Sequence, residues 1–95
     1  MMPKPPIDFK KVDALRRHML LTTVDMSKLL GVSRMTYYAW VRGRPIRPTN
    51  DEFVRTMLRR LLGIMTQHNW PMPSVIASAP KERQAQLLQL LDADK

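Results

Sequence analysis

Apolar residues recur at helical spacing along most of this 95-residue chain, and turn-forming residues separate the repeats. Phe9, Val12, Leu15 and Met19 follow Asp8 at intervals of three and four, which predicts a helix over 9–20 with Asp8 as its N-cap. The same reasoning predicts helices over 23–30, 34–42, 50–67 and 81–95. The chain is therefore predicted to be all-α, a compact bundle of about five helices.

Capping residues set the boundaries of the second and third predicted helices. Thr22 and Asp25 have the spacing of a capping box, in which each side chain bonds to the backbone N–H of the other residue. Gly31 suits the left-handed turn that ends a helix, and Ser33 is placed to cap the next one. These signals predict two short helices joined by a tight turn.

Residues 23–42 also divide into two faces. Helical spacing directs one set of residues towards a common core, with the glycine at the turn between the helices: Met26, Leu30, Gly31, Val32, Tyr37 and Trp40. The residues between them, including Arg34, Thr36, Tyr38 and Arg42, are predicted to face outward. The second of the two helices should therefore present a mainly polar surface.

The chain divides into four predicted segments. Three prolines exclude helix from residues 1–7, which are predicted to form an extended arm. Residues 8–70 form the main domain, and its last helix should start at Asn50 behind a second capping box of Thr49 and Glu52. Residues 71–80 are a predicted connector, and residues 81–95 a leucine-dense helix.

Positive charge is concentrated in the first half of the chain. The net charge is +8, with ten basic and three acidic side chains in residues 1–50 but six and five in residues 51–95. Such a charge indicates a polyanionic partner, although a basic run is also typical of a solvated surface. The chain has no cysteine and two separated histidines, so neither a metal site nor a cofactor is expected.

The segment from Leu15 to about Leu62 resembles the Cro/C1-type (lambda repressor-like) helix-turn-helix family of phage and bacterial regulators. Four features carry the resemblance: the Thr22 cap, the GVS of residues 31–33, the aromatic residues of RMTYYAWVRGR, and the proline after the arginine-rich loop. Ser27 stands where the family usually has alanine, so we expect its hydroxyl to bond to a backbone carbonyl. Tyr37 stands where a smaller residue is usual, and its hydroxyl is either buried or directed towards the phosphates.

The resemblance implies that residues 34–42 form a recognition helix in the major groove of DNA. Carried over position by position, it implies base readout by residues at and after the helix start: Ser33, Arg34, Met35, Tyr38 and Ala39. Among these, Arg34 is the strongest candidate because a guanidinium can bond to O6 and N7 of guanine together. The predicted phosphate contacts are Thr23, Thr36, Arg42, Arg44 and Arg47.

The favoured function is a DNA-binding transcriptional regulator, a repressor rather than an enzyme, with double-stranded DNA as its partner. A homodimer is expected, because such proteins commonly bind as twofold dimers. The candidate interface is the last helix, through Leu87, Leu88, Leu90 and Leu91, although this helix is equally able to fold back on its own domain. Two alternatives stay open: a phage DNA-packaging or replication-initiation protein, and an antitoxin-type module with a protein partner.

No apolar run approaches the roughly 20 residues of a membrane span, and the first residues lack the apolar stretch of a secretory signal. The expected location is therefore the cytoplasm of a bacterial or phage-infected cell, with no membrane partner.

Overall fold

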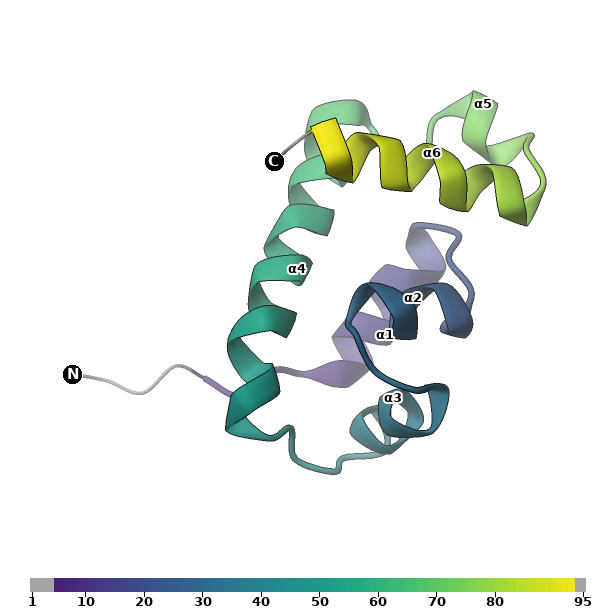
Figure 1. The fold of residues 1–95 in the computed structure, drawn as a ribbon. Helices are drawn as coiled ribbons and strands as arrows, with labels where there is room; N and C mark the ends of the chain where they lie inside the picture. Colours follow the sequence, from purple (N-terminus) through teal and green to yellow (C-terminus); the bar gives the residue numbers. More distant parts are fainter. Residues whose placement is uncertain (1–4, 94–95) are drawn as a thin grey trace.

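The structure, a computed structural model, describes residues 5–93 and shows six helices and no strand among them (Figure 1). The helices are α1 (Phe9–His18), α2 (Thr23–Leu29), α3 (Arg34–Val41), α4 (Pro48–His68), α5 (Pro73–Ile76) and α6 (Pro80–Ala93). The predicted all-α class is confirmed. The additional helix is α5, which lies within the predicted connector of residues 71–80. Residues 1–4 of the predicted arm and residues 94–95 lie outside the described residues.

The predicted caps of the first three helices are present. The Asp8 carboxylate accepts hydrogen bonds from the backbone N–H groups of Lys10 and Lys11 at the start of α1. Thr22 and Asp25 form the capping box of α2, with both bonds at 3.0 Å. Gly31 has a φ of +74°, in the left-handed region where a side chain would be strained.

Two helix boundaries differ from the prediction by two residues. α1 ends at His18 rather than at Leu20, because Leu20 itself adopts a left-handed conformation with a φ of 62°. α4 begins at Pro48, two residues early, with Arg47 in the N-cap position and no side-chain capping bond. Proline is pre-organised for the first helical position, so the predicted Thr49–Glu52 capping box is wrong and Thr49 lies inside the first turn.

One continuous core joins all six helices, and its buried apolar residues are Phe9, Val12, Met19, Leu21, Met26, Leu30, Tyr37, Trp40, Val54, Leu61, Ile64, Trp70, Val75, Leu87 and Leu91. On α4, Val54, Leu61 and Ile64 face this core, whereas Phe53 and Leu62 are exposed. Within residues 5–93, no helix combines the length and the apolar character needed to cross a bilayer.

Trp70 is a core residue that the sequence pattern did not predict. It follows the left-handed Asn69 that ends α4, and its indole N–H donates a 2.8 Å hydrogen bond to the Met19 carbonyl at the end of α1. This bond satisfies a buried polar group and ties the chain after α4 to the junction between α1 and α2.

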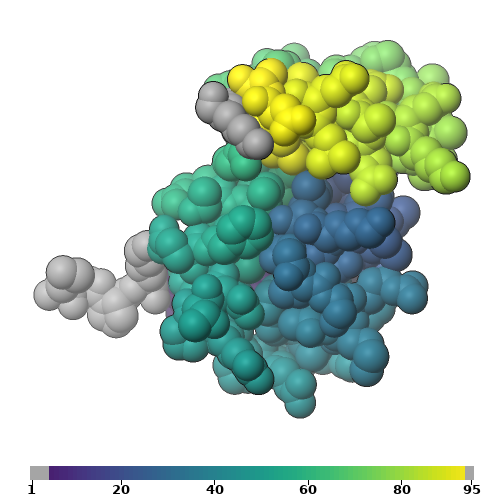
Figure 2. Space-filling view, in the orientation of Figure 1, coloured from purple at the N-terminus to yellow at the C-terminus, as the bar shows by residue number. Residues whose placement is uncertain are grey.

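α6 packs against α4 and α5 and closes the end of the molecule opposite α3 (Figures 1 and 2). Leu87 and Leu91 are buried, Leu90 is partly buried against the core, and Leu88 is 45% exposed. The predicted dimer interface is therefore wrong for Leu87 and Leu91, because the helix uses these side chains to complete its own core.

Candidate nucleic-acid interface

α2 and α3 are held together by the residues that the sequence pattern directed inward. Met26, Leu30, Tyr37 and Trp40 are buried, and Val32 is partly buried against the same core. Trp40 packs on Phe9 of α1 with ring centroids 4.9 Å apart. The inward side of α3 is thus fixed on α1 as well as on α2.

The Ser27 hydroxyl in α2 bonds to a backbone carbonyl, as predicted. Ser27 is buried against the core, and its hydroxyl donates a 2.9 Å hydrogen bond to the Val24 carbonyl. The polar atom is therefore satisfied without a partner from another helix, which allows the serine to be buried.

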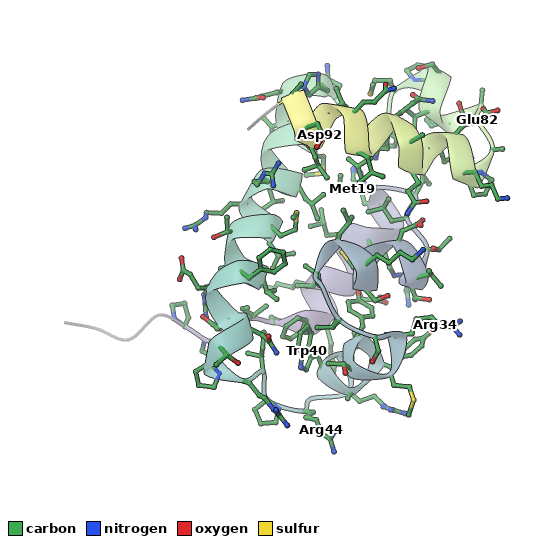
Figure 3. All side chains as sticks on the ribbon, in the orientation of Figure 1. Met19, Arg34, Trp40, Arg44, Glu82 and Asp92 are labelled. Carbon is green, nitrogen blue, oxygen red and sulfur yellow. The ribbon has the colours of Figure 1, made fainter. Side chains whose placement is uncertain are left out.

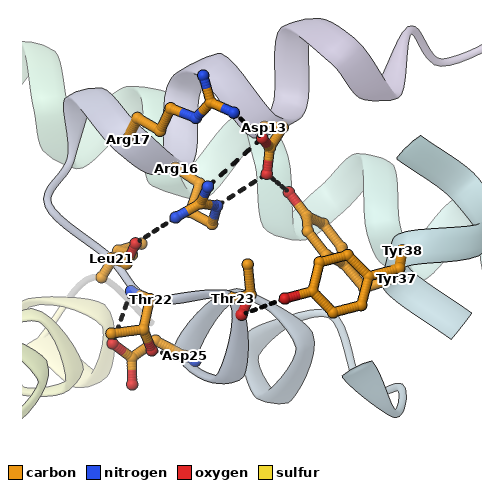
Figure 4. Close-up of polar contacts among 9 residues, drawn as sticks. All are labelled: Asp13, Arg16, Arg17, Leu21, Thr22, Thr23, Asp25, Tyr37 and Tyr38. Atoms are coloured by element: carbon orange, nitrogen blue, oxygen red, sulfur yellow. Dashed lines mark hydrogen bonds and ion pairs between the residues drawn. The ribbon is translucent and has the colours of Figure 1, made fainter. Parts of the chain in front are cut away.

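A polar network at Asp13 fixes the orientation of α3 (Figure 4). The Tyr37 hydroxyl donates a 2.9 Å hydrogen bond to Asp13 Oδ1, and Arg16 Nε donates to the same oxygen at 2.8 Å. Arg16 Nη1 also donates to the Leu21 carbonyl at 2.9 Å, and the exposed Arg17 pairs with Asp13 Oδ2. The hydroxyl whose direction was open is thus bonded inside the fold, between α1 and α3.

The charge states in this network follow from its contacts. The hydrogen bond from Arg16 is the main cause that holds the pKa of Asp13 below its ordinary value, although partial burial acts in the opposite direction. Burial, followed by the bond to Asp13, raises the pKa of Tyr37 far above its usual range. Asp13 is therefore ionised and Tyr37 neutral at physiological pH, so each bond keeps its donor and its acceptor.

The outer face of α3, which comprises Arg34, Met35, Tyr38, Ala39 and Arg42, points away from the core. Met35 is 82% exposed and Tyr38 is 44% exposed. A hollow on this side is lined by Met35, Thr36, Tyr38, Ala39, Arg42 and Arg44. The structure thus brings together four of the five predicted base-reading residues and three of the five predicted phosphate contacts, Thr36, Arg42 and Arg44, on one side of α3.

The hydroxyl groups next to this face bond to one another. The Tyr38 hydroxyl donates to Thr23 Oγ1 at 3.1 Å, across the turn between α2 and α3 (Figure 4). Ser33 Oγ caps α3 by accepting the Thr36 backbone N–H and donates to Thr36 Oγ1, both at 3.1 Å. The predicted base contact of Ser33 is therefore less favourable than expected, since its hydroxyl already serves as donor and acceptor.

Four arginines surround the outer face of α3 without an intramolecular partner. Within residues 5–93, the guanidinium groups of Arg34, Arg42, Arg44 and Arg47 have no hydrogen bond or ion pair. Arg34 and Arg44 point away from the helices, whereas Trp40 points into the core (Figure 3). No acidic residue occurs between Ser33 and Asn50 to neutralise these charges.

Sequence reasoning missed the Asp13 network. The spacing of three between Asp13 and Arg16 on one helix was a signal for an ion pair. It gave no indication that Tyr37, 24 residues further along the chain, would bond to the same carboxylate.

No protein family matches the sequence of this chain, and no curated protein or solved structure is significantly similar to it. Among the described residues, no group of three histidine, aspartate or glutamate side chains is placed to hold a metal ion.

Proposed function

We propose that this chain is a sequence-specific double-stranded DNA-binding protein that regulates transcription as a repressor, with α3 as its recognition helix. The observation that carries the proposal is the set of unpaired guanidinium groups, those of Arg34, Arg42, Arg44 and Arg47, around a helix whose inward side is locked in place. Unpaired arginines can neutralise phosphates without first breaking an internal bond, and they make binding strongly salt-dependent.

The dimensions and exposure of α3 also support this role. An α-helix with its side chains is about 10–12 Å across, which the major groove of about 12 Å admits. Arg34 occupies the first helical position, from which side chains of a recognition helix reach base edges. Arg42 at the C-cap and Arg44 in the following loop lie where the flanks of such a helix contact the backbone.

The electrostatic part of the proposal is tested with two variants that remove the same charge. We expect Arg42→Gln/Arg44→Gln to lower the slope of log K against log salt by about 2, which corresponds to two lost phosphate contacts. The matched control Arg59→Gln/Lys81→Gln removes two exposed charges from α4 and α6 and should leave the slope unchanged. Equal slopes for both variants and the original chain would show that the arginines near α3 do not contact the phosphates.

Specificity is tested by selecting bound sequences from random duplex DNA at a defined salt concentration. A recovered consensus is the expected result, and Arg34→Ala should relax the preference at one base pair by about 1–3 kcal/mol. If the chain enriched no sequence, or if the variant kept the full preference, the readout role of α3 would be refuted. A reporter with the selected site at its promoter then tests repression.

A homodimer stays part of the proposal, although Leu87 and Leu91 no longer serve as its interface. Two half-sites about 34–36 Å apart in the selected DNA would match a twofold dimer. Sedimentation of the chain with and without this DNA measures the number of copies directly. A single bound copy on an asymmetric site would rule the dimer out without affecting DNA binding itself.

A further inference from the structure

We infer that the outer face of α3 reads the 5-methyl group of thymine in the major groove, with the hollow beside Met35 as the seat of that methyl group. The inference rests on the proposed function and names the chemical group that this surface recognises. It follows from the hydrogen bonds that the Tyr38 and Ser33 hydroxyls already make and from the exposure of Met35.

Two hydroxyl protons near the hollow, those of Tyr38 and Ser33, are already used within the fold. Tyr38 donates its proton to Thr23 Oγ1, and Ser33 donates its proton to Thr36 Oγ1. Reading a base edge with either proton would first require breaking one of these bonds. Hydrogen-bond readout at this surface is therefore left to Arg34, which does not line the hollow, and to Thr36, whose hydroxyl accepts the bond from Ser33 and keeps its own proton.

Apolar atoms make up about half of the surface that the hollow offers to a base. Met35 is the most exposed large apolar side chain on this face, and it follows the helix start directly, with Ala39 one turn further along. The 5-methyl group of thymine is the apolar group that the major groove presents, and apolar side chains recognise it by contact. Met35 and Ala39, the two aliphatic residues that line the hollow, thus offer this methyl group an apolar contact.

Two arginines of the hollow, Arg42 and Arg44, can hold a DNA duplex over it. The unpaired Arg42 and Arg44 line its edge, so a duplex held there by its phosphates brings a base step against Met35 and Ala39. The same two cations would oppose a purely apolar partner, because docking such a partner would strip water from charges that gain no counterion.

The Tyr38 ring is pre-organised to form one wall. Its hydroxyl is fixed on α2 by the bond to Thr23, and its ring lies 6.4 Å from the buried Tyr37 ring. A side chain already held in place loses little rotamer freedom when a ligand arrives, so more of the contact energy contributes to affinity.

The test replaces each thymine of the selected duplex, one at a time, by deoxyuridine, which lacks only the methyl group. Affinity should fall about fourfold at one or more positions in the site, which corresponds to one methyl-sized group left in water. Met35→Ala should shrink this effect to about twofold or less. It should not disturb folding, because the Met35 side chain makes no core contact.

Leu62→Ala is the matched control, since Leu62 is an exposed apolar residue on α4. This variant should keep the full effect of deoxyuridine. The inference is overturned if specific binding persists but no deoxyuridine substitution changes it, or if Met35→Ala and the original chain respond equally; the proposed function survives either result. Absence of any DNA binding would instead overturn both.

Discussion

The arginines around α3 differ from those on α1, α4 and α6 in what their guanidinium groups contact. Each of four distant arginines donates to a backbone carbonyl: Arg16 to Leu21, Arg55 to Pro5, Arg60 to Leu91, and Arg83 to Val75 and Ile76. The four near α3 have no such bond within residues 5–93. The same residue type therefore closes the fold in one region and is left available for a partner in the other.

This difference matters more than the net charge of +8. An arginine that bonds to a partly buried carbonyl, as Arg16, Arg60 and Arg83 do, satisfies an acceptor that has limited access to water, so its removal should lower the free energy of unfolding. An exposed arginine without a partner contributes little to stability, so its removal should mainly lower the affinity for a partner. Measurements of stability and of DNA affinity should therefore separate the two groups.

The largest expected effect is at Arg16. Arg16→Met removes the bonds to Asp13 and to the Leu21 carbonyl at a side chain that is only 15% exposed. The free energy of unfolding, measured in urea, should therefore fall by about 3 kcal/mol. Arg17→Met is the control, because Arg17 pairs with the same carboxylate but is 74% exposed; its loss should stay below about 1 kcal/mol. Equal losses would mean that Arg16 has no special structural role.

The same network should make the free energy of unfolding depend on pH. This change should be no larger than the loss caused by Arg16→Met, because the hydrogen bond from Arg16 is the main cause of the lowered pKa of Asp13. The pKa of Asp13 in the folded chain lies below its ordinary value of 3.8, so the stabilisation is fully present above that pH. It should be lost as the pH falls through the lowered pKa, because the unfolded chain then binds the proton more readily. Urea titrations between pH 6 and pH 2 measure this, and Asp13→Asn should flatten the dependence.

A smaller effect is expected at Arg83, whose guanidinium donates to the two carbonyls that end α5. Arg83→Ala should lower the unfolding free energy by about 1.5 kcal/mol and leave the salt dependence of DNA binding unchanged. Lys81→Ala, an exposed change on the same helix, should have no measurable effect on stability. A changed salt slope for Arg83→Ala would contradict its assignment to the structural group.

The smallest change in stability is expected for Arg42→Gln/Arg44→Gln. Both side chains are exposed and unpaired, so thermal unfolding should agree with that of the original chain within about 0.5 kcal/mol. The loss of salt-dependent DNA binding described above should appear in the same preparation. A clear loss of stability in this variant would break the division between the two groups of arginines.

Local signals in the sequence predicted much of the helical region around α3. The caps at Asp8, Thr22 and Ser33 depend on residues two or three positions apart, and such spacings are visible in the sequence. Gly31 likewise marked its turn, because glycine is the residue that adopts its φ of +74° without strain.

Contacts between distant segments were not predictable in the same way. The bond between Trp70 and Met19 joins positions 51 residues apart, and the bond between Arg60 and Leu91 joins positions 31 apart. Neither leaves a periodic trace in the sequence. The leucines of α6 show the same limit, since their spacing predicted a buried face but not whether its partner was this chain or a second copy.

The separation of the two sides of α3 has a consequence for how such a protein diverges. Tyr37 and Trp40 complete the core, whereas Met35, Ala39 and Arg42 contribute nothing to it. Under the proposed function, selection for a new DNA target can therefore replace these three residues one at a time while the fold retains its stability. Among residues 5–93, the hydrogen bond from Tyr38 to Thr23 is what links this surface to the neighbouring helix α2.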